Sequence, residues 1–206
     1  MKPVLTAGDL ESVAAGGEVA IAPETLVTPL AREEAERRRI TLRVVEADSA
    51  AGGSPRRVVA IAADHGGYEL KERLKVHLRD WGYTVLDLGT DSAAAVDYPD
   101  FAEAVANTVA RGEAWRGVVL DSVGIGSAIA ANKVPGARAA LCYDRATARN
   151  SREHNDANLL SLGARLIPAE TAREILAVWL ETPFAGGRHQ RRLDKIRAIE
   201  ERHAKK

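Results

Sequence analysis

Short apolar runs alternate with longer amphipathic segments from residue 56 onward, and no other feature limits the possible fold as strongly. The run over residues 58–63 is apolar at every position, which is typical of a strand covered on both faces. The next segment places Leu70, Leu74 and Leu78 on one stripe of a helix that ends at Gly82. The pattern recurs, and it predicts a parallel sheet with helices on both faces. Further strands are expected at residues 84–88, 117–121, 138–143 and 158–162, and further helices near residues 98–111, 127–133, 144–152, 168–181 and 190–204.

The chain divides into two unequal parts. Residues 47–55 are small and polar and contain no large apolar side chain, which favours a linker. They separate an N-terminal extension, residues 1–46, from the main domain, residues 56–206.

The extension has its own helix signal. Thr28 and Pro29 are typical of an N-cap and of the first position of a helix, which we expect over residues 30–39. Short strands are expected at residues 18–22 and 40–46, so the extension is predicted to be a small α/β module.

Composition excludes several classes of function. The 206 residues carry 29 basic and 29 acidic side chains, so no global field attracts nucleic acid or an anionic membrane. One cysteine cannot form an internal disulfide, no signal-peptide pattern occurs, and no apolar run approaches the roughly 20 residues that cross a bilayer. We therefore expect a cytoplasmic protein with neither nucleic-acid nor membrane partners.

Polar residues follow two of the predicted strands, at the end of the sheet where open parallel sheets bind ligands. Asp64 and His65, with two glycines after them, follow the first strand. Residues 121–127 follow the third strand and contain a Gly-x-Gly-Ser turn whose backbone amides suit an oxyanion or phosphate. A His or Asp in such a turn also serves as a helix cap. Asp121 is therefore either a cap or a base whose pKa is set by partial burial.

Two further polar clusters lie toward the C-terminus. Residues 151–158 contain His154 and Asn155, although such runs are also common in ordinary turns. Arg188 and Arg192 follow two glycines and lie one helical turn apart, which suits a phosphate clamp or a solvated basic face. The strongly basic C-terminal stretch is likewise either solvated, anion-binding or a subunit contact.

Other chemistries have little support in the sequence. The five histidines show no spacing typical of metal ligands, so neither a metal nor another cofactor is expected. Cys142 lies within a predicted strand, where a small buried hydrophobe is the expected role.

Six motifs, taken together and in order, resemble the family of ribose-5-phosphate isomerase B and the galactose-6-phosphate isomerase subunits. They occupy residues 64–67, 96–100, 124–126, 130–133, 152–158 and 186–190. The resemblance implies a Rossmann-like three-layer sandwich with a five-stranded parallel sheet. It also implies a cofactor-free aldose–ketose isomerisation of ribose 5-phosphate, by a homodimer or a tetramer made of two dimers.

The resemblance also assigns roles to residues, because this reaction moves a proton between C1 and C2 through a cis-enediolate. His154 would assist opening of the sugar ring. The residues expected to contact the sugar are Asp64, Tyr98, Asn155 and His65, the last of which would either orient the sugar or touch the phosphate. The turn expected to hold the enediolate oxygens includes Gly124, Gly126 and Ser127. The residues expected to clamp the phosphate are Arg165, Arg188 and Arg192.

One position departs from the family pattern. The best-known branch has a catalytic Cys where this chain has Asp121, followed by Gly and Thr where it has Ser122 and Val123. Another branch has Glu at the position of Ser127. A serine at this position cannot act as a strong base. We hypothesise that Asp121 replaces the thiolate as the base, with Ser122 as the candidate for the missing hydroxyl.

This departure leaves two alternatives open. The pocket could be adapted to another sugar phosphate, such as that of a tetrose, a deoxy sugar or a hexose. Alternatively, the chain could be a paralogue that binds sugar phosphates or serves as a scaffold without catalysing a reaction.

The N-terminal extension carries a second, shorter resemblance. Residues 26–32, with Arg39 and Ile40 after them, are similar to N-terminal segments on several enzymes of bacterial microcompartments. This implies that residues 1–55 tether the enzyme to a shell or cargo protein inside such a compartment. The alternative is a small module that packs on its own dimer.

Overall fold

The structure is a computed structural model that describes residues 4–10, 13–21, 25–44 and 57–204. The chain forms two compact units, residues 1–55 and 56–206. The predicted linker at residues 47–55 lies outside the described residues, as do the last residues of the strands predicted at 18–22 and 40–46. None of the helices in the described part of the chain is long and apolar enough to cross a membrane.

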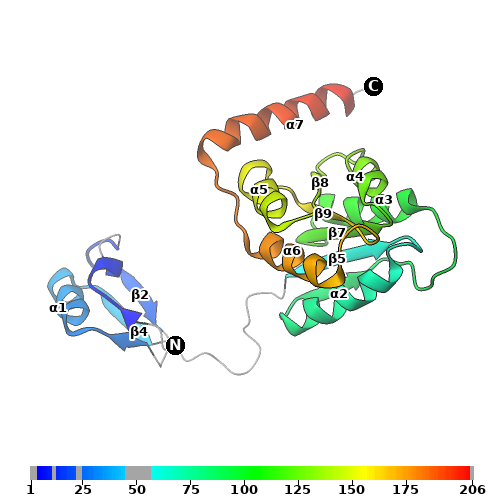
Figure 1. The fold of residues 1–206 in the computed structure, drawn as a ribbon. Helices are drawn as coiled ribbons and strands as arrows, with labels where there is room; N and C mark the ends of the chain where they lie inside the picture. Colours follow the sequence, from blue (N-terminus) through cyan, green and yellow to red (C-terminus); the bar gives the residue numbers. More distant parts are fainter. Residues whose placement is uncertain (1–3, 11–12, 22–24, 45–56, 205–206) are drawn as a thin grey trace. The chain divides into compact units, whose positions relative to one another are not determined.

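The larger unit is built on a five-stranded sheet in which every strand runs parallel to its neighbours. Its strands are β5 (Val58–Ala63), β6 (Thr84–Asp87), β7 (Arg116–Asp121), β8 (Ala139–Leu141) and β9 (Leu159–Gly163). Their order across the sheet is β6-β5-β7-β9-β8 (Figure 1). Strand β6 therefore lies on one side of β5 and strand β7 on the other. Because the connections leave β5 in opposite directions, a crevice forms between the carboxyl ends of β5 and β7.

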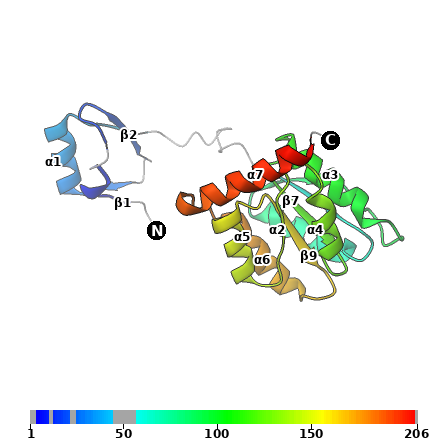
Figure 2. The ribbon, with the colours of Figure 1, turned by 90° about the horizontal axis from the view of Figure 1, so that it is seen from above.

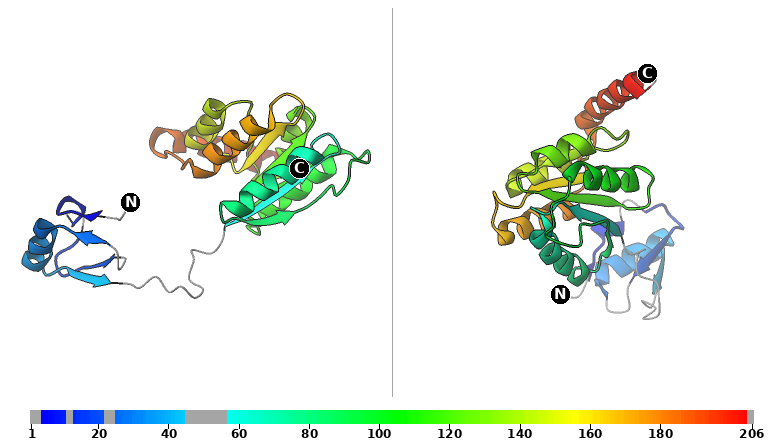
Figure 3. Two further views of the ribbon diagram at one scale, coloured as in Figure 1. Left: turned by 60° about the horizontal axis from the view of Figure 1, so that its bottom comes forward. Right: turned by 90° about the vertical axis from the view of Figure 1, so that its right-hand side faces the viewer.

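Helices cover both faces of this sheet (Figures 1 and 3). Successive strand residues point to opposite faces, so Ile61 packs in a cluster with α2, α5 and α6, whereas Ala60 packs in another with α3 and α4. The helices are α2 (Tyr68–Asp80), α3 (Tyr98–Ala110), α4 (Ile125–Ala131), α5 (Arg145–Asn155), α6 (Ala169–Glu181) and α7 (Gln190–Ala204). The predicted three-layer α/β fold with five parallel strands is confirmed.

Two helix boundaries differ from the prediction, and both affect the site. Helix α4 begins at Ile125 rather than near residue 127, because Gly124 adopts φ 87° and ends the preceding turn. Helix α5 runs to Asn155 rather than to residue 152, and ends where Asp156 adopts φ 45°. His154 and Asn155 are therefore the last residues of a helix and not part of a turn.

The C-terminal helix α7 follows a short 3-10 turn, η2 (Gly187–His189), and lies on the outside of the unit (Figure 2). Glu200 on this helix accepts a 2.8 Å hydrogen bond from the backbone amide of Gly136, in the loop between α4 and β8. Ile196 and Ile199 are 44% and 50% exposed beside a cavity of about 670 Å³ beneath the helix. This part of α7 thus leaves apolar surface uncovered in the single chain.

The smaller unit has a core of its own. Thr28 Oγ1 accepts a 3.2 Å hydrogen bond from the amide of Ala31, and Pro29 is the first helical residue, as predicted. The core side chains are Leu10, Ala31, Ala35 and Ile40. Its elements are β1 (Val4–Leu5), η1 (Gly8–Leu10), β2 (Glu18–Ile21), β3 (Leu26–Val27), α1 (Pro29–Arg38) and β4 (Thr41–Val44), with β1 paired to β3 and β2 to β4.

Candidate active site

Two buried carboxylates flank the crevice between β5 and β7. Asp64 follows β5 and Asp121 ends β7, and their side chains belong to residues that are only 6% and 5% exposed. Oδ1 of Asp64 accepts hydrogen bonds from the amides of Gly66 at 2.8 Å and Gly67 at 3.0 Å. Asp64 therefore stabilises the turn that leads into α2, whatever further role it has.

Asp121 accepts four hydrogen bonds from the turn that follows it. Oδ1 accepts from the amides of Val123, at 2.7 Å, and Gly124. Oδ2 accepts from the amide of Ser127 at 3.0 Å and from its hydroxyl at 2.6 Å. Because each carboxylate oxygen has about two acceptor positions, the carboxylate is fully satisfied. Two of the backbone amides that the sequence suggested for a substrate oxyanion, those of Gly124 and Ser127, thus bind Asp121 in this state.

These contacts set the basicity of Asp121. Burial favours the neutral acid and raises the pKa, but the hydrogen bonds from the Ser127 hydroxyl and the three amides outweigh it. The pKa of Asp121 is therefore below that of an ordinary aspartate. Asp121 is ionised at neutral pH and is a weaker base than a free carboxylate.

The turn over residues 121–127 is braced from three sides. The Ser161 hydroxyl donates a 2.6 Å hydrogen bond to the carbonyl of Gly124, and the Tyr143 hydroxyl donates one of 2.9 Å to that of Val123. Gly163, at the end of β9, lies so close that a Cβ there would come within 2.3 Å of the Val123 carbonyl oxygen. The amide donors are thus fixed in position before any ligand binds.

Other predicted residues gather at the same edge of the sheet. The ring of Tyr98 covers Gly126, where an added Cβ would lie 2.6 Å from it. The Ser122 hydroxyl lies against Gly66, at the entry to α2. His65 Nδ1 lies 3.2 Å from the backbone oxygen of Val96, which holds the ring beside the start of α3.

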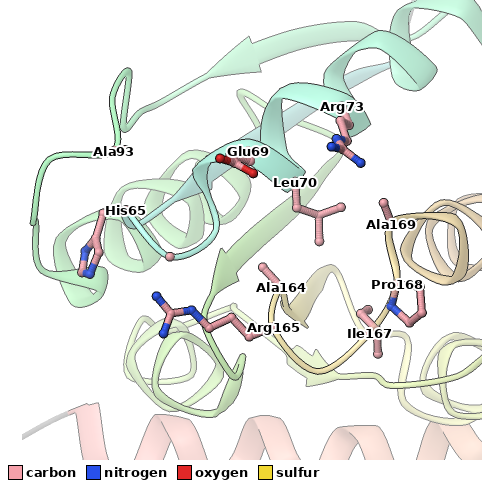
Figure 4. A pocket seen from close by; sticks show the side chains of 11 residues that line it. His65, Glu69, Leu70, Arg73, Ala93, Ala164, Arg165, Ile167, Pro168 and Ala169 are labelled. Atoms are coloured by element: carbon pink, nitrogen blue, oxygen red, sulfur yellow. The ribbon is translucent and has the colours of Figure 1, made fainter.

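A cavity of about 500 Å³ opens at this edge between the first turns of α2 and α6 (Figure 4). His65 and Arg165 stand on one side of it, and the Arg165 guanidinium extends toward His65. Glu69 and Arg73 from α2 also line it, although the sequence analysis assigned them no role. Their i, i+4 spacing just after the Asp64 motif is the sequence signal that could have identified them.

The remaining predicted residues lie at the opposite edge of the sheet. Helix α5 runs from the carboxyl end of β8 back to the amino end of β9, so its last residues, His154 and Asn155, lie at the amino edge. The segment after α6 reaches the same place, because the amide of Ala185 donates a 3.0 Å hydrogen bond to the carbonyl of Glu153. Arg188 and Arg192 follow on this side. A single chain therefore brings the predicted residues together in two separate groups.

His189 joins the second group, although the sequence analysis gave it no role. Its ring stacks on that of His154, with centroids 4.1 Å apart and planes 9° apart. The Arg188 Nε donates to His189 Nε2 at 3.4 Å. Asn155 is exposed and lines the cavity beneath α7.

Cys142 is 1% exposed, and burial raises the pKa of its thiol to about 11. It is a buried hydrophobe in the α2, α5 and α6 cluster, as the sequence predicted. Within the described residues, no three His, Cys, Asp or Glu side chains gather in a way that could hold a metal ion.

Comparison with known proteins places these groups in context. A family model described as ribose/galactose isomerase matches residues 59–196. Ribose-5-phosphate isomerase B of Escherichia coli (strain K12) is 43% identical over 144 residues, which are 70% of this chain and 97% of that protein. D-erythrulose-4-phosphate isomerase of Pectobacterium atrosepticum is 40% identical over 139 residues, 67% of this chain and 91% of that protein.

The same likeness holds in three dimensions. The solved structure of Clostridium thermocellum ribose-5-phosphate isomerase B superposes with a TM-score of 0.70 at 49% sequence identity. The superposition covers 71% of this chain and 99% of that one. The family match begins at residue 59, so the smaller unit lies outside it.

Proposed function

The chain belongs to the ribose/galactose isomerase family, and from that premise we propose that it interconverts an aldose phosphate and its ketose phosphate, with ribose 5-phosphate and ribulose 5-phosphate as the first pair. The observation that carries the proposal is the arrangement at the crevice between β5 and β7. The Asp121 carboxylate ends β7 and is followed by a braced turn of amide donors. This turn is joined to Arg165, whose backbone amide donates a 3.0 Å hydrogen bond to the Ser122 carbonyl, and Arg165 lines the neighbouring cavity together with His65. An isomerase needs a base, oxyanion donors and a phosphate site in such a place.

The active unit that we propose is a homodimer. His154, Arg188 and Arg192 lie at the amino edge of the sheet in each chain, whereas Asp121 and His65 lie at the carboxyl edge. A second copy can bring its amino-edge group to the carboxyl edge of the first. The uncovered apolar surface of α7 beside Ile196 and Ile199 supports such a contact.

In the proposed mechanism Asp121 is the base. His154 assists opening of the sugar ring. Asp121 then removes the proton on C2 of the open-chain aldose and returns it to C1, while the proton on the C2 hydroxyl passes to O1. To accept a proton the carboxylate must give up a hydrogen bond, and the Ser127 hydroxyl is the donor that can rotate away. The amides of Ile125 and Gly126, which Asp121 does not engage, then stabilise the enediolate oxygens.

A tetrose phosphate is the second candidate substrate. Support comes from the relative from Pectobacterium, which is named D-erythrulose-4-phosphate isomerase. Its sequence identity to this chain is close to that of the ribose-5-phosphate isomerase from Escherichia coli. The two substrates differ by one carbon and share the phosphate and the C1–C2 chemistry. They therefore use the same base and the same amide donors.

The test follows both the product and the proton. Full-length protein is incubated in heavy water with ribose 5-phosphate or erythrose 4-phosphate, and NMR records ketose formation and deuterium at C2 of the aldose. Conversion with exchange is expected for one of them. Failure with both, and with deoxy sugar and hexose phosphates, would favour a binding or scaffolding role.

For the smaller unit we propose a tether to a shell or cargo protein of a bacterial microcompartment, which would place the enzyme inside it. Support comes from its independent core and from Leu30, which is 64% exposed on α1. The test is co-sedimentation of the full chain with shell proteins, against the same chain carrying Leu30→Glu. No sedimentation of either chain would favour a module that packs on its own dimer, whereas equal sedimentation of the two would show that Leu30 is not the contact.

A further inference from the structure

His189 is buried, although its ring can carry a charge. It is 7% exposed, and its side chain contacts the residues assigned to ring opening and to phosphate binding. His154 lies parallel to it at 4.1 Å, and Arg188 donates to it. Packing alone does not require an imidazole here, because a phenyl ring would fill a similar volume.

The contact with Arg188 fixes the form of the ring. A guanidinium only donates hydrogen bonds, so His189 Nε2 must be the acceptor and the ring proton must be on Nδ1. Burial, with the guanidinium charges of Arg188 and Arg192 nearby, lowers the pKa of His189 and favours the neutral ring. Nδ1 is buried and has no hydrogen-bond partner among the described residues.

His154 is then held from two directions. Asn150 Nδ2 lies 2.9 Å from His154 Nδ1, and the face of the ring rests on His189. Within the described residues no hydrogen bond engages His154 Nε2, so this nitrogen is available to the substrate.

We propose that His189 is a positioning residue, an inference that rests on the isomerase activity proposed above. Its ring face sets the plane of His154 for opening of the sugar ring, and its Nε2 aims the Arg188 guanidinium at the phosphate. One neutral side chain thereby aligns the two groups that each chain supplies from its amino edge. Neither task needs His189 to touch the substrate.

Two substitutions separate the tasks. His189→Phe keeps an aromatic face for His154 but removes the acceptor for Arg188. His189→Gln keeps a polar acceptor but removes the aromatic face. His77→Phe is the matched control, because His77 also stacks on an aromatic ring, that of Trp81 at 5.9 Å, and lies on α2 away from both groups.

The kinetic measurement uses both directions of the ribose 5-phosphate reaction, because ribose 5-phosphate arrives as a closed ring and ribulose 5-phosphate as an open chain. For His189→Gln, kcat with the aldose phosphate is expected to fall about tenfold, while exchange of the C1 proton of the ketose phosphate changes by less than about twofold. For His189→Phe, KM is expected to rise about tenfold in both directions, with kcat changed far less. Wild-type values for either variant, or an equal loss of kcat in both directions for His189→Gln, would overturn the inference.

A second readout does not depend on activity. Ring-current effects on the His154 Cε1 proton are recorded by NMR in the full-length protein without ligand. His189→Gln is expected to move this signal downfield, because the shielding ring is lost, whereas His189→Phe keeps it upfield and His77→Phe leaves it at its wild-type position. An unchanged signal in His189→Gln would overturn the inference, whether or not any sugar phosphate is converted. Inactivity of the wild type with the whole substrate panel would overturn only the proposed function.

Discussion

The Ser127 hydroxyl donates a 2.6 Å hydrogen bond to Oδ2 of Asp121. The two residues lie six positions apart, at the end of β7 and in the first turns of α4, and both are almost fully buried. This bond lowers the pKa of Asp121 and occupies one of its acceptor positions. Ser127 therefore restrains the group that we propose as the base.

Removing that restraint should strengthen the base. In Ser127→Ala the pKa of Asp121 rises toward its ordinary value, so the acid limb of kcat/KM moves to higher pH. At neutral pH we expect kcat to rise about two- to fivefold, since a carboxylate with a higher pKa accepts a carbon-bound proton more readily. Ser151→Ala is the control, because that buried hydroxyl donates to the carbonyl of Ala148 on its own helix and does not bond to Asp121. A lower kcat with an unchanged acid limb would contradict this view of Ser127.

Asp121→Asn should remove the base while retaining two of the four hydrogen bonds that hold the turn. The amide oxygen can still accept from Val123 and Gly124, whereas the amide nitrogen faces the two Ser127 donors. Turnover is expected to fall by several orders of magnitude, and binding of the sugar phosphate, measured by calorimetry, is expected to persist. Turnover near that of the wild type would show that another group moves the proton.

Asp121 should also contribute a pH-dependent part of the stability. Its pKa is depressed in the folded chain, so this contribution is complete above the unfolded-state pKa, about 4, and is lost as the pH falls through the lower folded-state value. The difference in unfolding free energy between wild type and Asp121→Asn should therefore be constant from pH 7 to pH 5 and shrink below about pH 4. Denaturant titrations at several pH values measure it. A difference that grows in acid would contradict the direction of the shift.

Thiol reagents should distinguish this chain from relatives with a cysteine base. The single cysteine, Cys142, is buried with a pKa raised to about 11, so iodoacetamide at pH 8 should leave the wild type active. Asp121→Cys places a thiol beside the amides of Gly124 and Ser127, which favour the thiolate. We expect this variant to be alkylated at residue 121 and inactivated. Mass spectrometry locates the label, and modification at Cys142 would count against its burial.

The order and type of the elements in the larger unit could be predicted from the sequence, because the strands are apolar runs and the helices carry clear apolar stripes. Boundaries near the site were less accurate. Helix α4 begins early because Gly124 adopts a left-handed conformation and the Asp121 carboxylate binds the free amides of the first turn. The two-residue strands β1 and β3 went unpredicted, since so short a run carries no periodicity.

The residues at the site could also be identified largely from their motifs, but their arrangement could not. Sequence spacing does not show that the Asp121 carboxylate accepts hydrogen bonds from amides expected to bind a substrate oxyanion. These bonds depend on the backbone path from Val123 to Ser127. His189 was passed over for a similar reason. Its ring stacks on that of His154, which lies thirty-five positions earlier in the chain. This contact arises only because the segment after α6 packs against α5.

Hybrid dimers test whether two chains share each site. Asp121 and His154 lie at opposite edges of one chain, so a site that spans two copies takes one residue from each. A hybrid of Asp121→Asn and His154→Asn chains then has one site with both changes and one site with neither. Random exchange of subunits makes about half of the dimers hybrid, so a mixture of two inactive variants should recover about a quarter of wild-type activity. If both residues of a site came from the same chain, every site would carry one change and mixing would restore nothing. Assay of the mixture after partial unfolding and refolding, with each variant treated alone as the control, therefore decides between the two arrangements.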